Sequence, residues 1–197
     1  MAQTQAPDTQ KLYKPDTSTE LACFRHHLQA YRGVTFQALD WVPEDKLGWR
    51  PAVGLLSFSE QFDHIAATEE LYIQGLSHGR WRDTLEFEFG IVKKRQQLRD
   101  RLNAARAVTL SFLDSLTAAR LSEEVRFGNG PLVFAIRSVL LQLIAHEVHH
   151  KAQLSHYLYA QGIQAPFFAA PLPPGMRPDN LTLPPGYRAK PVVGAAP

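Results

Sequence analysis

The sequence is poor in the residues and runs that mark secreted or membrane proteins. Cys23 is the single cysteine in 197 residues, which excludes an intramolecular disulfide framework and fits a reducing compartment. The first twenty residues are polar, and no run of eighteen apolar residues follows. We therefore expect a cytoplasmic protein that does not cross a membrane.

An excess of charge of one sign is also missing. Lysine and arginine number 21 against 19 acidic residues, and the formal net charge is +2. No block of basic residues stands apart from the acidic ones, as it does in most nucleic-acid-binding proteins. Nucleic acid is therefore not an expected partner.

Proline is scarce in the middle of the chain and abundant at its end. Only Pro43, Pro51 and Pro131 occur between residues 19 and 165, whereas nine of the fourteen prolines lie in residues 166–197. Such a proline-rich stretch cannot form a helix and has little apolar surface to bury. We predict a flexible segment over residues 1–18, one ordered domain over 19–165 and an extended tail over 166–197.

Apolar residues recur at helical spacing through most of the ordered part. We predict helices over residues 19–41, 58–78 and 91–119, and a fourth from Pro131, in its first turn, to residue 159. Ser57 and Glu60 are spaced to form a capping box at the second helix. Only Leu85, Phe87 and Phe89 alternate enough to permit a short extended piece. The expected fold is all-α, a four-helix bundle with long crossover connections.

The segment "LLQLIAHEVHHKAQLSHYLYAQG", residues 140–162, places histidines in the predicted fourth helix. At about 100° per residue, His146 and His150 share the buried stripe and His149 lies at its margin. The predicted stripe comprises Leu132, Val139, Leu143, His146, His150, Gln153 and Tyr157.

Two inward imidazoles one turn apart can bind a single ion. The alternative is a pair of metal-free core histidines, which would need hydrogen-bond partners for four ring nitrogens in an apolar seam. We favour a divalent metal, with a third ligand supplied by another helix. The remaining histidines are expected to be surface or hydrogen-bonded residues: His26, His27, His78 and His156.

The same residues match the H-E-x-x-H pattern of zinc peptidases. However, no glutamate follows Glu147 that could complete such a site, and Gln153 replaces the glycine at which the chain turns toward a third histidine. A peptidase is therefore disfavoured. Glu147 lies about 60° from the centre of the predicted stripe, where an interhelical hydrogen bond or a contact with a ligand is favoured over activation of water.

Two segments resemble a known family. "ALDWVPEDKLGWRPAVGLLSFSEQFDHIAATEE" and "AHEVHHKAQL" are similar to the loop, second helix and fourth helix of the DinB/YfiT-like superfamily of metal-binding four-helix bundles. The resemblance implies that His64, His146 and His150 are the metal ligands, and that the protein is a homodimer. Ala145 and the pair Lys151 and Ala152 depart from the family's asparagine, arginine and glycine, but no ligand is lost.

The resemblance implies a divalent-metal-dependent enzyme, most simply a transferase that uses a low-molecular-weight thiol on small electrophiles. Two alternatives stay open: a hydrolase that uses metal-bound water, and a non-catalytic metal-binding protein of the stress response. Three imidazoles suit zinc or nickel best, and iron or copper are also compatible. The sequence identifies no catalytic residue. Arg25, Arg32 and Trp49 are compatible with a pocket mouth or with solvated and packing roles, and Tyr157 is the aromatic residue expected nearest the metal.

Overall fold

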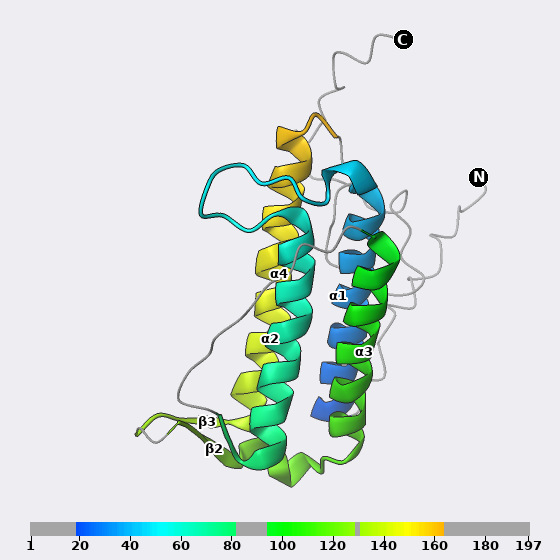
Figure 1. Ribbon diagram of the computed structural model, residues 1–197. Coiled ribbons are helices and arrows are strands. Elements are labelled where there is room, and N and C mark those ends of the chain that lie inside the picture. The colour runs from blue at the N-terminus through cyan, green and yellow to red at the C-terminus, as the bar shows by residue number, and fades with distance from the viewer. Residues whose placement is uncertain (1–18, 82–93, 129–130, 164–197) are drawn as a thin grey trace, which may run out of the picture. The chain divides into compact units, whose positions relative to one another are not determined.

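The computed structural model describes residues 19–81, 94–128 and 131–163 (Figure 1). Four helices lie side by side: α1 (Glu20–Trp41), α2 (Phe58–His78), α3 (Arg95–Asp114) and α4 (Ile136–Ala160). α2 packs on α3 and α4, and α1 packs on the same two helices. Short 3-10 helices cover Glu44–Lys46 and Ala118–Ser122. The predicted all-α bundle is confirmed.

The helix ends follow the predicted capping chemistry. The Ser57 hydroxyl accepts from the Glu60 N–H at 3.3 Å, and the Glu60 carboxylate accepts from the Ser57 N–H at 2.6 Å. This reciprocal box satisfies two donors that a helix start leaves without partners. Gly79 ends α2 in the left-handed region, at φ 72°, which glycine adopts without steric cost.

Two clusters of buried apolar side chains fill the bundle. One contains Phe58, Phe62 and Leu158 and is closed by Trp49 and Tyr157. The other contains Ile73, Trp81 and Leu140 and lies toward the end of α2 and the start of α4. No helix in the described part of the chain is both long and apolar enough to cross a membrane.

The sequence pattern gave no sign of a sheet, but the structure contains a small one. Strands β1 (Arg80–Trp81), β2 (Glu124–Phe127) and β3 (Val133–Ala135) form a sheet in the order β1-β2-β3, with β1 parallel and β3 antiparallel to β2. The strands β2 and β3 lie at one end of the bundle in Figure 1. Strands of two to four residues are too short to show an alternating pattern, so only tertiary pairing defines them.

The structure also corrects two helix boundaries. α4 begins at Ile136 rather than at Pro131, because Val133–Ala135 pairs with β2. Leu132 is consequently exposed and not part of a buried stripe. α3 ends at Asp114, short of the predicted residue 119, and a 3-10 turn follows. The alternating residues Leu85, Phe87 and Phe89, and both predicted terminal segments, fall outside the described residues.

Candidate metal centre

Three histidines from two helices meet at one point of the bundle. His64 comes from the second turn of α2, and His146 and His150 lie one turn apart on α4. The Nε2 atom of His146 is 3.1 Å from Nε2 of His64 and 3.1 Å from Nε2 of His150. The three ligand atoms lie within 4.8 Å of one another. The structure thus brings together all three residues that the sequence pointed to.

The spacing of these nitrogen atoms fits a shared cation. With metal–nitrogen bonds of about 2.0–2.1 Å, two imidazole nitrogens on one ion are roughly 3.0–3.4 Å apart, depending on the angle at the metal. The observed 3.1 Å separations fall in this range. Neutral imidazole is also a donor that zinc and nickel accept readily. The residues present therefore fit a divalent transition-metal ion.

Neighbouring side chains hold the rings in the orientation that a metal would need. The Nδ1 atom of His150 donates to the Gln61 carbonyl oxygen at 3.1 Å, which leaves Nε2 of that ring as the acceptor. Gln61 is itself buried in α2. Thr68 Oγ1 lies 3.5 Å from Nδ1 of His64. Sequence reasoning missed Gln61, although its position one turn before His64 could have suggested it.

The environment keeps the imidazoles neutral. Burial lowers the pKa of His150 to about 3, and the neighbouring His146 and His64 add to this effect. Burial, together with His64 and His149, lowers the pKa of His146 to about 4. Burial also lowers the pKa of His64. Neutral rings offer the lone pairs that bind a cation, so the cluster is ready for a metal at neutral pH.

Glu147, between the two α4 histidines, binds arginines rather than the histidine cluster. Its Oε1 accepts from Arg32 Nε at 2.8 Å and from the Thr35 hydroxyl at 2.6 Å. Its Oε2 accepts from Arg106 at 2.7 Å. Burial alone would raise the pKa of Glu147, but the guanidinium groups of Arg32 and Arg106 outweigh it and hold that pKa below its usual range.

Glu69 completes a buried network with these residues. Its carboxylate accepts from Arg106 Nε at 2.7 Å and from the Thr109 hydroxyl at 2.6 Å, and it also pairs with Arg32. We call Arg32, Glu69, Arg106 and Glu147 the buried charge network, to which α1, α2, α3 and α4 contribute one residue each. All four side chains are at most 7% exposed. The network adjoins the candidate metal centre, because His146 lines a narrow gap together with Glu69, Arg106 and Glu147.

The network corrects the predicted stripe of the fourth helix. Glu147 is fully buried and His146 is only partly buried, the reverse of what the apolar pattern indicated. α4 can turn Glu147 toward the bundle interior because two guanidinium groups neutralise its carboxylate there. The predicted interhelical hydrogen bonds of Glu147 are confirmed. Arg32 is neither solvated nor at a pocket mouth, since it lies between the helices.

The other singled-out residues lie away from the cluster or contact it indirectly. His149 is exposed, with Nε2 2.9 Å from Gln153 Nε2. Tyr157 packs edge-on against Trp49 and Phe58, with ring centroids 5.7 and 5.6 Å away, so packing accounts for Tyr157 and Trp49. Arg25 pairs with Asp114 at the bundle surface.

Comparison with known proteins agrees with this arrangement. Residues 27–154, which contain all three histidines, match the DinB superfamily. The uncharacterized protein YjoA of Bacillus subtilis (strain 168) is 25% identical over 148 residues, covering 72% of this chain and 92% of YjoA.

Solved structures show the same fold. The crystal structure of the DinB-like YjoA protein from Bacillus subtilis aligns with a TM-score of 0.61 at 22% identity, over 76% of this chain and 99% of that one. A DinB-like protein from Bacillus cereus ATCC 10987 aligns with a TM-score of 0.60 at 18% identity, over 73% and 93%. With a matching sequence over most of its bundle and the matching fold, the chain belongs to the DinB superfamily.

Proposed function

We propose that this protein is a divalent-metal-dependent transferase that joins a low-molecular-weight thiol to a small electrophilic substrate. The observation that carries the proposal is the convergence of three neutral imidazole nitrogens, with 3.1 Å between neighbouring Nε2 atoms. His64, His146 and His150 would hold the ion.

Three protein ligands suit catalysis better than a purely structural role. Structural zinc sites are closed by four protein ligands, whereas catalytic sites keep a position for substrate. Only three histidine, cysteine or carboxylate ligands gather here among the described residues. His64 and His146 are also partly exposed, so a small molecule can approach the cluster from solvent.

A divalent ion held by neutral ligands would favour the thiolate form of a bound thiol and polarise a substrate oxygen. The chain's own residues set the conditions for this chemistry. Gln61 fixes the tautomer of His150, and burial keeps the imidazoles unprotonated at neutral pH. The buried charge network fixes the part of α4 that carries two of the ligands.

The position of Glu147 argues for the thiol reaction over hydrolysis. A hydrolase of the H-E-x-x-H type uses this glutamate as a general base. Here both carboxylate oxygens are occupied by Arg32, Thr35 and Arg106. Asp63, beside His64 in the sequence, pairs with Arg101 at 3.3 Å. A thiolate is a strong nucleophile once formed and has less need of a carboxylate base.

Two measurements test the proposal. Elemental analysis of protein purified without a metal-affinity step should find one divalent transition metal per chain. Incubation with a panel of small thiols and monobromobimane should show thiol conjugation above the uncatalysed rate, and a chelator should abolish the excess.

A matched pair of variants separates the site from general effects. His146→Ala should lose both metal and conjugation. His156→Ala, an exposed histidine on the same helix, should keep both. Thiol-independent cleavage of an ester probe would instead support the hydrolase, and a stoichiometric metal without either activity would support the non-catalytic alternative. A metal content unaffected by His146→Ala would overturn the site itself.

A further inference from the structure

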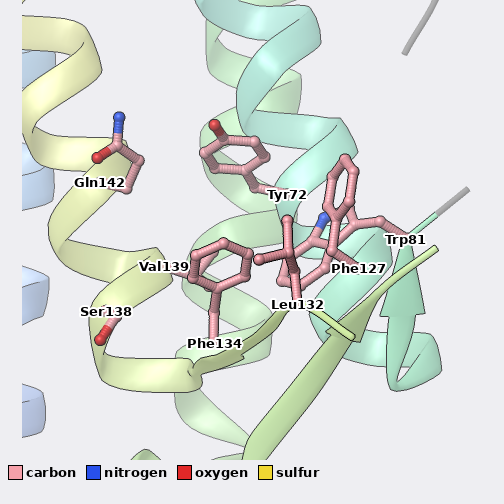
Figure 2. A pocket seen from close by; sticks show the side chains of 8 residues that line it. All are labelled: Tyr72, Trp81, Phe127, Leu132, Phe134, Ser138, Val139 and Gln142. Carbon is pink, nitrogen blue, oxygen red and sulfur yellow. The ribbon is translucent and has the colours of Figure 1, made fainter. Parts of the chain in front are cut away.

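An apolar pocket, lined by residues other than the three histidines, lies at the sheet end of the bundle (Figure 2). Its volume of about 480 Å³ is in the range that holds small organic molecules. Aromatic and aliphatic side chains from α2, α4 and the three strands or their flanks form its walls: Tyr72, Trp81, Phe127, Leu132, Phe134 and Val139.

Aromatic side chains dominate these walls. The Trp81 ring lies with its centroid 6.3 Å from Tyr72, 6.1 Å from Phe127 and 6.4 Å from Phe134. Tyr72 and Phe134 both meet it edge-on, at 75° and 83°. A further planar ring can pack edge-on or offset against side chains of this kind. Phe134 and Leu132 are also 42% and 58% exposed, so part of this apolar wall faces solvent.

The pocket also contains a polar group that lacks a partner. Trp81 is only 5% exposed, and its buried indole N–H makes no hydrogen bond within the described residues. In Figure 2 the indole nitrogen lies on the side of Trp81 that faces Tyr72 and Leu132. An unpaired buried donor destabilises the folded protein, and a ligand with an acceptor atom would supply the missing hydrogen bond.

The backbone is shaped to keep the indole in this position. A Cβ atom on Gly75 of α2 would lie 2.0 Å from Trp81 Nε1, so only glycine allows the ring to lie against the helix. In return, the backbone pairing of Trp81 with Phe127 fixes β1 on the sheet. The donor is therefore held in place before any ligand binds.

The pocket and the histidine cluster lie along the same pair of helices. Gln142, on the pocket wall, is one turn before His146 on α4, about 6 Å along the axis. Tyr72, also on the wall, is eight residues beyond His64 on α2, about 12 Å along the axis. The pocket wall and the imidazoles therefore lie within about 12 Å of one another along these two helices.

We infer that this pocket binds an aromatic small molecule through its ring and donates one hydrogen bond to it from the Trp81 indole N–H, which an acceptor of the molecule such as a carbonyl oxygen receives. The identification of that molecule as the electrophilic substrate rests on the proposed function. The binding itself does not, because none of the three clustered histidines is among the described residues that line the pocket.

Nuclear magnetic resonance of the indole N–H groups tests the inference directly. The probe is acetophenone, which carries a ring and a carbonyl acceptor, and ethylbenzene is the control that lacks the acceptor. The Trp81 signal is assigned by its loss in Trp81→Phe. Acetophenone should move this signal downfield with saturation, while the Trp41 and Trp49 signals stay in place, and ethylbenzene should bind at least several-fold more weakly without the downfield shift.

A pair of variants locates the probe. Ser138 is an exposed residue on the pocket wall, and Ser138→Phe should fill the space and abolish the shift. Ser111→Phe makes the same change at an exposed site on α3 and should leave binding intact. Far-ultraviolet circular dichroism checks that both variants fold.

The titration is done with chelator present, so its outcome does not depend on the metal. Saturable binding without any thiol conjugation would support the pocket and reject the proposed function. No saturable shift in folded wild-type protein, or equal shifts with ethylbenzene, would overturn the inference whatever the enzyme assays show.

Discussion

Glu147 illustrates how the partners of a residue, more than the motif around it, determine its role. The H-E-x-x-H pattern gives this position to a general base, yet the carboxylate here is buried between Arg32 and Arg106. A carboxylate so enclosed stays ionised and has no free lone pair directed at a substrate. Its contribution is to stability and to the orientation of the histidines beside it.

Replacing Glu147 by glutamine should therefore destabilise the protein strongly. Glu147→Gln removes one of two negative charges that face two buried guanidinium groups, and breaking a buried pair in this way costs about 3–5 kcal/mol. Urea unfolding in the presence of chelator measures the loss without a metal contribution. As a control, Glu123→Gln removes an exposed charge paired with Arg120 and should cost less than about 1 kcal/mol. Similar losses in the two variants would contradict the assignment.

The pH dependence of stability should report the histidine cluster. The pKa values of about 4 for His146 and about 3 for His150 are below the 6.5 of a free imidazole. Between about pH 6.5 and pH 4 the unfolded chain therefore binds more protons than the folded one, so stability falls as the pH falls through this range. Urea midpoints from pH 7.5 to 4.5 with chelator should show this decline. The double variant His146→Gln and His150→Gln should show a smaller decline, and an unchanged slope would count against the cluster.

At the scale of residues, the sequence predicted the histidine cluster better than the residues that support it. Helical spacing alone paired His146 with His150, and the family resemblance added His64. Spacing could not find Arg32, Glu69 or Arg106, because a charged residue inside a helical pattern usually indicates the solvent face. Whether such a residue is buried depends on the charges that other helices bring to it, and this is a property of the fold.

At the scale of elements, two glycines within helices have opposite surroundings. A Cβ atom on Gly33 of α1 would meet no atom within 4 Å, whereas one on Gly75 of α2 would overlap the Trp81 indole. Gly33→Ala should stabilise the protein by about 0.5–1 kcal/mol through helix propensity. Gly75→Ala should destabilise it despite the same gain, because β1 must move away from α2.

Urea unfolding of both variants checks the sign of each effect. Tryptophan emission of Gly75→Ala should also shift to longer wavelength as Trp81 becomes more exposed, while Gly33→Ala keeps the wild-type spectrum. A stabilised Gly75→Ala variant would show that the Trp81 indole does not pack against α2 at Gly75.

The helices were predictable and the strands were not, for one physical reason. α1 and α2 have periodic apolar faces and recognisable caps, so local sequence defines them to within about a residue. Val133–Ala135 has no such local signal and becomes a strand only because Glu124–Phe127 lies beside it. The start of α4 was therefore placed too early, and with it the predicted stripe.

At the scale of the whole molecule, a bound metal should act as a link between α2 and α4. An ion that binds the folded state and not the unfolded chain raises stability by about 4 kcal/mol when its concentration is a thousand times the dissociation constant. Chelation should therefore lower the melting temperature of the wild type by several degrees, and readdition of zinc or nickel should restore it. His150→Ala should melt at the same temperature with and without chelator, whereas His156→Ala should behave as the wild type.

The buried charge network has a consequence for how the bundle comes apart. Each of its four charges sits on a different helix and finds its counterions only on other helices. Pulling any one helix away would strand a charge in a poorly solvated interior, which penalises half-assembled forms more than a wholly open chain. The four helices should consequently separate in a single cooperative transition, with no stable three-helix intermediate.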